Sequence, residues 1–451
     1  MIPSIAEVVS QFKREWTNCL APEAISNLCR EAGLSWRERL LTPATTIQLM
    51  LLQVLHGNTA IGHLPRLAKL EFWPSSFCRA RMRIPLTILE ILLQRIADFL
   101  QLEDYNKHTW LGHRVFIADG TAVSMPDTSQ LESAFGYQSR QLKGATFPVS
   151  RLVFMLHLGT GMIAKVLINP FRSHEARFVA DLHPELREND IFLADRAFCS
   201  YTHFCLLLQR GAHALIRMNA KMLSSFATKQ IPKGHRKPLR LRKPDGRVQL
   251  QLLGKSDHIV QWNKPTAPTA SMTPEQYRSL PESIVVRELL YRIQQKGFRS
   301  QEIIVLTTLL DVEKYPPREI AALYKMRWQI ETNFNHLKTT MKMDILRAKT
   351  ADGIRKEIYA FCIIYNLVRL VMIQAAKQHR VPVSRISFAD ALRWLAAASP
   401  GQPIIRINIV PHRPGRFEPR SRKRRPKPGY PCLMMPRQEL RKKKLTQMFS
   451  R

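Results

Sequence analysis

The sequence predicts an α/β protein that begins with a helical domain and carries a β-rich insertion. Three observations predict this class: helical spacing of apolar residues at the start, short strand-like apolar runs in the middle, and a return of helical spacing near residue 313. With 451 residues, 45% of them hydrophobic, the chain can bury the cores of two or three domains. We predict an N-terminal helical domain at 1–105, the first part of the core at 106–218, the insertion at 219–312, the second part of the core at 313–400, and a basic C-terminal tail at 401–451.

Residues 1–105 are predicted to form helices. The segments SIAEVVSQFKREW, ATTIQLMLLQVLHG and PLTILEILLQRIADFL are amphipathic, and LPRLAKL lies between the last two with Gly and Pro at its borders. We predict that this domain binds DNA through a recognition helix. The alternative is a unit that serves only packing or dimerisation.

From residue 106 the pattern changes to short apolar runs. RVFIA predicts a strand ending at Asp119, and RLVFMLHL and MIAKVLINP predict two strands joined by a turn at GTG. A helix over SHEARFVADLHPEL, a strand over IFLA ending at Asp195, a helix over CSYTHFCLLLQRG and a strand over HALIRM follow. This order of elements is that of a ribonuclease-H-like core. In that fold the first strand lies beside the fourth, so Asp119 and Asp195 are expected to meet.

The insertion at 219–312 is predicted to be mostly sheet, because it contains RVQLQLLG, HIVQW, SIVVRELLYRI and EIIVLTTLL between Pro- and Gly-rich connections. Pro316 and Pro317 then favour the start of a helix, since proline is tolerated in a first turn. A helix over IRKEIYAFCIIYNLVRLVMIQAAKQH is expected to cover the core. The tail contains RSRKRRPKP and LRKKK, which predict an exposed segment without a core of its own.

The net charge of +34 lies almost entirely in the second half of the chain. Residues 1–105 carry 11 basic and 10 acidic residues and 106–205 carry 10 and 9, whereas 206–312 carry 18 and 7, 313–410 carry 16 and 7, and 411–451 carry 14 and 2. Nucleic acid is the expected partner, because Lys and Arg that neutralise phosphates release counterions. An acidic membrane is the competing interpretation, but no basic amphipathic helix or lipidation motif supports it, and we predict no membrane partner.

Cysteine usage and hydropathy predict the location of the protein. The 7 cysteines form no C-x-x-C pair, so free thiols in a reducing compartment are expected. The sequence has no uninterrupted apolar run of about 18 residues and no charged N-terminal region followed by an apolar one. We therefore expect a cytoplasmic protein that associates with the nucleoid.

The segment YKMRWQIETNFNHLKTT predicts an amphipathic helix with one ordered polar stripe. On an α-helix Tyr324, Arg327, Glu331 and Lys338 fall within about 60° of one another. Beside them runs an apolar stripe that can anchor the helix, formed by Leu323, Ile330, Phe334, Leu337 and Met341. The helix would thus present one carboxylate flanked by cationic and phenolic groups.

Asp119, Asp195 and Glu331 together predict a site for two divalent metal ions. Hard cations such as Mg²⁺ prefer carboxylate oxygens, and two ions roughly 4 Å apart can serve both the attacking and the leaving oxygen of a phosphodiester. Each acid also has a simpler interpretation. Asp119 precedes Gly120 and could belong to a turn, Asp195 could pair with the adjacent arginine, and Glu331 could pair with Lys338 or face solvent.

These residues resemble the signature of the DDE transposases of bacterial insertion sequences, in particular the insertion-sequence-four family. The hallmark of that family is Y-x2-R-x3-E-x6-K, and Tyr324, Arg327, Glu331 and Lys338 match it at every position. FIADGT and LADRAF resemble the surroundings of the family's two aspartates, here Asp119 and Asp195. The resemblance extends over roughly residues 106–375.

The resemblance implies a cut-and-paste enzyme whose catalytic, metal-binding triad is Asp119, Asp195 and Glu331. Such enzymes bind the terminal inverted repeats of their own element, pair two ends in a dimeric synapse, and cut with Mg²⁺, for which Mn²⁺ substitutes. A freed 3′-OH attacks the opposite strand to give a hairpin, or later attacks target DNA. By the same likeness Tyr324, Arg327 and Lys338 contact phosphates; salt bridges on a helix face are the alternative.

Three further residues are weaker candidates for DNA binding. Trp262 in the insertion could stack on a flipped base, and Trp328 could compete for that role, although each is more often a packing residue. Arg217, at the end of HALIRM, could reach DNA or simply be solvated.

Two other functions compete with transposition. One is a ribonuclease-H-like DNA nuclease without strand transfer, which would use the same acids and metals. The other is a non-enzymatic, transposase-derived DNA-binding protein; the intact set of three acids argues against it.

Overall fold

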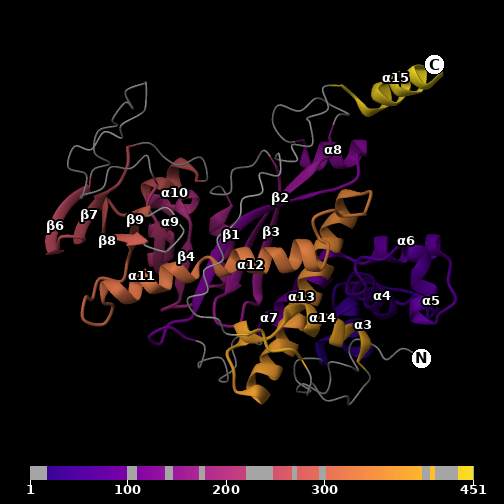
Figure 1. The fold of residues 1–451 in the computed structure, drawn as a ribbon, viewed down its shortest axis with the longest axis horizontal. Helices are drawn as coiled ribbons and strands as arrows, with labels where there is room; N and C mark the ends of the chain where they lie inside the picture. Colours follow the sequence, from indigo (N-terminus) through magenta and orange to yellow (C-terminus); the bar gives the residue numbers. More distant parts are fainter. Residues whose placement is uncertain are drawn as a thin grey trace.

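The protein is built around one mixed sheet of nine strands, with helices α3–α6 at one end and strands β6–β9 at the other (Figure 1). We describe it from a computed structural model. The residues it describes are 18–98, 109–137, 146–171, 178–219, 247–266, 272–293, 301–398, 407–411 and 435–449. The predicted helix SIAEVVSQFKREW therefore lies outside the described residues.

The N-terminal region is helical, as the sequence predicts. Its α-helices are α3 (Pro22–Glu31), α4 (Pro43–Leu55), α5 (Leu64–Ala68), α6 (Pro74–Arg83) and α7 (Leu86–Asp98). Helix α4 starts at proline behind the N-cap Thr42, whose hydroxyl accepts a hydrogen bond from the Thr45 N–H at 3.2 Å. Ten of its side chains are buried, so α4 is the central helix of this region.

Five strands form the core half of the sheet in the order β3-β2-β1-β4-β5. They are β1 (Val115–Ser124), β2 (Val149–His157), β3 (Ile163–Pro170), β4 (Ile191–Ala194) and β5 (His213–Arg217). Strands β1–β3 pair antiparallel, whereas β4 runs parallel to both β1 and β5. Helices α8 (Ser129–Phe135) and α9 (Tyr201–Gln209) accompany them. This is the predicted ribonuclease-H-like arrangement, with β1 beside β4.

Two details differ from the prediction. Strand β1 does not end at Asp119 but continues to Ser124, because its pairing with β2 runs on after its pairing with β4 stops at Ala118. The predicted helix over SHEARFVADLHPEL is a 3₁₀ helix, η7 (Val179–Glu185), in its described part. Pro184 lies inside it and lacks the N–H that an α-helical turn requires.

The insertion extends the core sheet. Its strands are β6 (Arg247–Gly254), β7 (Asp257–Asn263), β8 (Ser283–Ile293) and β9 (Gln301–Thr307), with the short helix α10 (Pro274–Arg278). Strand β9 pairs antiparallel with β5, and β8, β7 and β6 follow outward. The described strands of the insertion and of the core therefore belong to one sheet.

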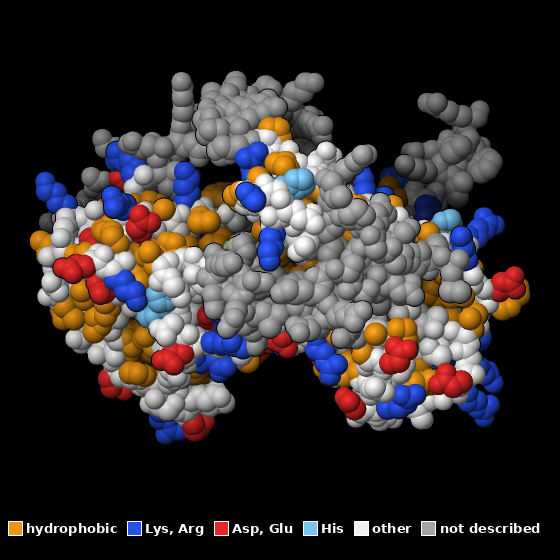
Figure 2. Space-filling view, turned by 90° about the horizontal axis from the view of Figure 1, so that it is seen from below, with side chains coloured by type: hydrophobic (Ala, Val, Ile, Leu, Met, Phe, Trp, Pro, Cys, Tyr) orange, Lys and Arg blue, Asp and Glu red, His pale blue; other side chains and the backbone are white. Residues whose placement is uncertain are grey.

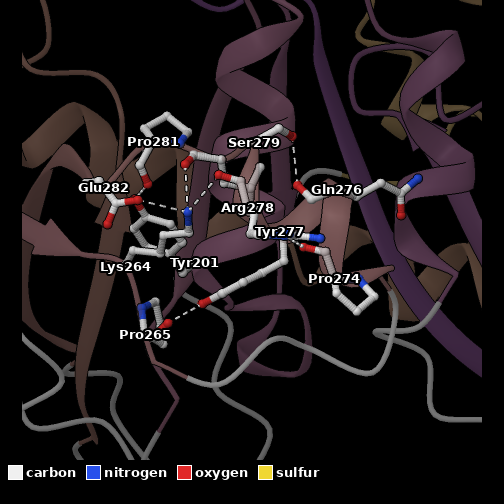
Figure 3. Close-up of polar contacts among 11 residues, drawn as sticks. Tyr201, Lys264, Pro265, Pro274, Gln276, Tyr277, Arg278, Ser279, Pro281 and Glu282 are labelled. Atoms are coloured by element: carbon white, nitrogen blue, oxygen red, sulfur yellow. Dashed lines mark hydrogen bonds and ion pairs between the residues drawn. The ribbon is translucent and has the colours of Figure 1, made fainter.

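Polar contacts fix the insertion to the core helix α9 (Figure 3). The Tyr201 hydroxyl of α9 donates to the Pro281 carbonyl at 2.6 Å. In the insertion, Lys264 Nζ donates to the Leu280 carbonyl at 2.9 Å and pairs with the Glu282 carboxylate at 3.1 Å. These bonds hold the loop before β8 against α9.

The described residues from Pro317 onward are mostly helical. Their helices and helical turns are α11 (Pro317–Met326), α12 (Gln329–Asn335), the π turn η9 (His336–Thr340), α13 (Ala351–His379), the 3₁₀ turn η10 (Val383–Arg385), α14 (Phe388–Ala397) and α15 (Arg437–Phe449). Helix α13 is long and apolar enough to cross a membrane by composition, but 89% of its most apolar window is buried inside the protein. It is a core helix. In the predicted tail, RSRKRRPKP lies outside the described residues, and LRKKK lies in α15.

Two hydrophobic cores cover the two faces of the sheet. One packs the N-terminal helices and α11–α14 against one face of β1–β5, and the other packs α9 against the opposite face of these strands; both include residues of the insertion. Polar bonds also link the N-terminal helices to α13: Asn58 Nδ2 donates to Glu357 Oε1 at 2.7 Å, and Lys356 Nζ donates to the carbonyls of Arg81 and Met82 at 3.1 Å each. The N-terminal helices thus pack against α13 and the sheet; the predicted boundary at residue 105 stays a prediction.

Candidate active site

Two aspartates lie side by side where β1 and β4 separate. In the parallel register Ala118 faces Ala194, and the next residues along the two strands are Asp119 and Asp195. Four apolar positions precede each acid and are buried, so the strands are anchored up to the carboxylates. Rigid strands therefore hold both acids, as a geometrically demanding site requires.

Glu331 faces Asp119 across a hollow of about 330 Å³. The hollow lies between β1 and the α12 segment and is lined mainly by polar groups: Asp119, Gly120, Thr121, Glu331, Phe334, Asn335, Lys338 and Thr339. Asp119 also lies within electrostatic range of both Glu331 and Asp195. The three acids that the sequence singles out therefore lie near one another, although Asp195 is not part of the lining of the hollow.

Asp119 is tightly held on both of its oxygens. Its Oδ1 accepts the Gly120 N–H at 2.8 Å, and its Oδ2 pairs with Arg327 Nη1 at 3.0 Å. Burial raises the pKa of the Asp119 carboxyl to about 6, against the lowering effects of the Gly120 N–H and Arg327; the neighbouring carboxylates Glu331 and Asp195 raise it further. The Arg327 side chain is only 8% exposed, so this ion pair is largely shielded from water.

The other signature side chains also face the two acidic strands. The Tyr324 hydroxyl donates to the Ala194 carbonyl at 3.4 Å, next to Asp195, and Lys338 Nζ donates to Thr121 Oγ1 at 3.4 Å. Burial raises the pKa of the Tyr324 phenol, so its hydroxyl stays protonated and can donate. The signature therefore connects to the strands that carry Asp119 and Asp195.

The sequence predicted that the four signature residues lie on one regular α-helix. The structure differs: they lie on α11, α12 and the turns beside these helices. Helix α11 ends at Met326, and the next hydrogen bonds span three residues, such as Glu331 N–H to the Trp328 carbonyl at 3.2 Å. After α12 the helix widens into the π turn that contains Lys338, closed by the Met341 N–H bonding to the His336 carbonyl at 2.9 Å. Such irregular turns often occur at functional sites.

The chemistry of the site suits hard divalent cations. Three carboxylates supply oxygen donors, and Asp195 Oδ1 is buried without a hydrogen-bond partner in the described structure. In this structure the three carboxylates do not form a site for a single ion: among the described residues, no three His, Cys, Asp or Glu are grouped closely enough to hold one. Arg327 occupies one oxygen of Asp119 in this arrangement.

Comparisons with known proteins identify the family of this chain. A family model described as the transposase DDE domain matches residues 110–367, more than half of the chain. The chain belongs to the DDE transposases. The transposase InsG for insertion sequence element IS4 of Escherichia coli K12 is 25% identical over 340 residues, covering 73% of this chain and 70% of InsG.

Another relative is also a transposase of an insertion sequence element. A putative transposase for insertion sequence element IS4SA from Synechocystis is 23% identical over 283 residues, covering 63% of this chain and 65% of the relative. The predicted resemblance to the insertion-sequence-four family is thereby confirmed. A solved synaptic complex of the piggyBac transposase with hairpin DNA spans 87% of this chain and 76% of its own, at a TM-score of 0.40 and 11% identity, which is too low to bear on function.

The weaker candidates lie in different surroundings in this transposase. Arg217 follows Ile216, which pairs with Ala194, so it lies level with Asp195 on the neighbouring strand and is partly exposed. Trp328 is 59% exposed beside the Arg327 guanidinium, which lies 5.6 Å from its ring centroid.

Trp262 is a core residue in this structure. It is 2% exposed and packs edge-on against Tyr201 and Phe204 at 5.5 Å each, with the Arg247 guanidinium 5.6 Å from its ring centroid. Because its ring is covered in this way, no face is left for a flipped base. The sequence shows only that a tryptophan lies in a strand, and it does not show which side of the sheet that strand buries.

Two residues of the hollow carry no motif signal of their own. Thr121 lies two positions after Asp119 on the same face of β1, and Asn335 lies one helical turn after Glu331. The alternation of strand side chains and the spacing of helical ones are the signals that can find them.

Proposed function

We propose that this transposase excises and inserts its insertion sequence by Mg²⁺-dependent cleavage and strand transfer, in a cut-and-paste reaction. One observation carries the proposal: Asp119 and Asp195 are adjacent on parallel strands, and Glu331 faces Asp119 across one polar hollow. This is the set of rigidly held oxygen donors that two-metal phosphodiester chemistry uses.

In the proposed site Asp119, Asp195 and Glu331 hold two Mg²⁺ ions, which Mn²⁺ can replace. Bound divalent ions of this kind activate the attacking oxygen and stabilise the leaving one. The free Oδ1 of Asp195 is available for this role, and the ion pair of Asp119 with Arg327 keeps a carboxylate ionised where burial opposes it.

We assign DNA contacts to the cations near the three acids. Lys338 lines it with a single long contact to Thr121, which leaves donors for a phosphate, and Arg217 lies partly exposed beside Asp195. Arg327 remains a proposed phosphate contact, its fork shared with Asp119 in this structure. Tyr324 is 3% exposed, so its role here is to support the strand of Asp195.

The proposed substrates are the terminal inverted repeats of the element and a target DNA, held by a homodimer that pairs two ends. Support comes from family membership and from relatives whose names refer to insertion sequence elements. The net charge of +34 suits such a polyanionic substrate.

Replacement of Glu331 by Gln tests the proposal. The full-length variant should lose Mg²⁺-dependent cleavage of DNA carrying the terminal repeats by about a thousandfold or more, because an amide is a poor ligand for a hard cation. It should still bind that DNA. Glu313→Gln makes the same chemical change in an exposed position outside the hollow and should cleave normally.

Two outcomes would contradict the proposal. Unchanged cleavage by Glu331→Gln would remove Glu331 from the site. Cleavage by the unsubstituted protein without any joining of cut ends to target DNA would instead indicate a nuclease that does not transfer strands.

A further inference from the structure

The far end of the N-terminal helices carries a groove that the catalytic mechanism does not use. Two hollows of about 760 and 740 Å³ adjoin there and share Glu71, Phe72 and Trp73. We call this surface the Trp73 groove. Its cationic lining residues are Arg37, Arg39, Arg66, Lys69, Arg79 and Arg83.

The groove is strongly basic although the N-terminal region as a whole is nearly neutral. All six cations are exposed, and the described residues provide no ion-pair partner for any of them. Glu71 is the acidic residue in the lining of both hollows. Figure 2 shows Lys and Arg side chains along the right-hand end of the molecule, the end formed by α5 and α6 in Figure 1. Cations without acidic partners around a hollow attract a polyanion.

Trp73 adds an aromatic platform to this charge. Its side chain is 78% exposed, and it stands at the N-cap of α6 between the two hollows. A large ring this exposed contributes little to a core, whereas an aromatic face beside arginines is suited to a sugar or base next to a phosphate. Leu40, 47% exposed, lines the same groove.

Helix α6 presents one side to the groove and the other to the core. Ser76, Arg79 and Arg83 follow three- and four-residue steps and line the groove, while Phe77 and Ala80 are buried. The carbonyls of its last turn accept hydrogen bonds from Lys356 of α13, whose side chain is 2% exposed. The charge of Lys356 also suits the C-terminal end of a helix. Helix α6 is thereby fixed to the body that holds the catalytic acids.

We propose that the Trp73 groove binds the phosphate backbone of duplex DNA, outside the bond that is cut, and so sets the position of that bond at the hollow. This inference rests on the proposed function in that the ligand is the same DNA. Duplex DNA fits better than a protein partner, because six exposed cations and one glutamate line this surface, whereas the core of a protein interface is depleted of charged residues.

The test compares two double variants of the full-length protein by fluorescence anisotropy with a labelled duplex. Arg79→Gln with Arg83→Gln should weaken binding about tenfold or more, and it should lower the slope of log affinity against log salt by about two, because each arginine neutralises one phosphate. The matched control, Arg210→Gln with Arg278→Gln, removes the same charge from exposed positions at the C-cap of α9 and in α10 and should change affinity less than twofold.

Trp73→Ala gives a second measurement. It should weaken duplex binding about fivefold or more because the stacking surface is removed, without changing the salt slope. Unchanged affinity in both Trp73→Ala and the Arg79 and Arg83 variant would overturn the inference, as would an equal loss in the control. A loss confined to single-stranded DNA would also overturn it.

The failure of the two proposals can be told apart. If the unsubstituted chain binds no DNA, the proposed function fails and with it the groove. If it binds and cleaves duplex DNA while the groove variants keep full affinity, only the groove is wrong. Glu331→Gln, with its groove intact, should bind as the unsubstituted protein does.

Discussion

The polar hollow and the Trp73 groove both have cations at their borders, but these cations are in opposite situations. In the hollow, Arg327 is buried against Asp119, and Lys338 reaches Thr121. In the groove, residues such as Arg79 and Arg83 are exposed and lack an acidic partner among the described residues. The difference indicates that Arg327 holds an acid in place, whereas the groove arginines are free for an external anion. Substitutions at the two surfaces can test this contrast.

The largest expected effect is on stability, from Arg327→Met. The change leaves the Asp119 carboxylate without its cation in a largely buried place, so the free energy of unfolding in urea at pH 7.5 should fall by about 3 kcal/mol. Combining it with Asp119→Asn should restore most of the loss, since no unpaired charge remains. A double variant as unstable as the single one would show that the pair itself does not matter for folding.

Lys356→Met should have the next largest effect, because Lys356 connects the two regions. The substitution removes charge-assisted bonds to the Arg81 and Met82 carbonyls, and we expect a loss of about 2 kcal/mol in the free energy of unfolding. Lys349→Met, at an exposed position, is the control and should be neutral. Equal stability of the two variants would mean that α6 is held by its apolar contacts alone.

A pH series should affect the hollow and spare the groove. Because the pKa of Asp119 is raised to about 6, its carboxyl takes up a proton below that value and loses the charge that a cation needs. Mg²⁺-dependent cleavage should therefore fall about tenfold per unit below pH 6, while duplex affinity through arginine changes little from pH 8 to 5. Cleavage that stays constant to pH 5 would contradict this role of Asp119.

The smallest expected effect is that of the two groove substitutions on the stability of the protein. Arg79→Gln with Arg83→Gln removes exposed charges without acidic partners, so the free energy of unfolding should change by less than about 0.5 kcal/mol. A loss of more than about 1 kcal/mol in urea would show that these arginines are structural after all, as Arg327 is.

The sequence predicted the core and the three acids because those features are local. Apolar runs mark the strands of Asp119 and Asp195, and the spacing around Glu331 marks its helix. What it missed depends on distant contacts. The pairing of Arg327 with Asp119 joins residues 208 positions apart, and the burial of Trp262 depends on α9.

The Trp73 groove was also missed from the sequence, because the charges were counted over the whole of residues 1–105. Counted over residues 1–105 the charges nearly cancel, yet residues 30–83 contain eight Lys and Arg and three Glu, and the fold gathers six of those cations around Trp73. The continuation of the core sheet into the insertion is likewise invisible in sequence, because it depends on the pairing of β5 with β9.

The π turn at His336–Thr340 bears on how the signature can vary in related chains. A turn closed over five residues contains one residue more than a regular turn, so everything after it is shifted in phase by one position. The six residues between Glu331 and Lys338 therefore include the start of the π turn, and they also set the spacing of the two side chains along the helix. We expect exposed positions of this stretch such as Thr332 to accept changes of side chain, but the gain or loss of a single residue would rotate the lysine away from the β1 strand.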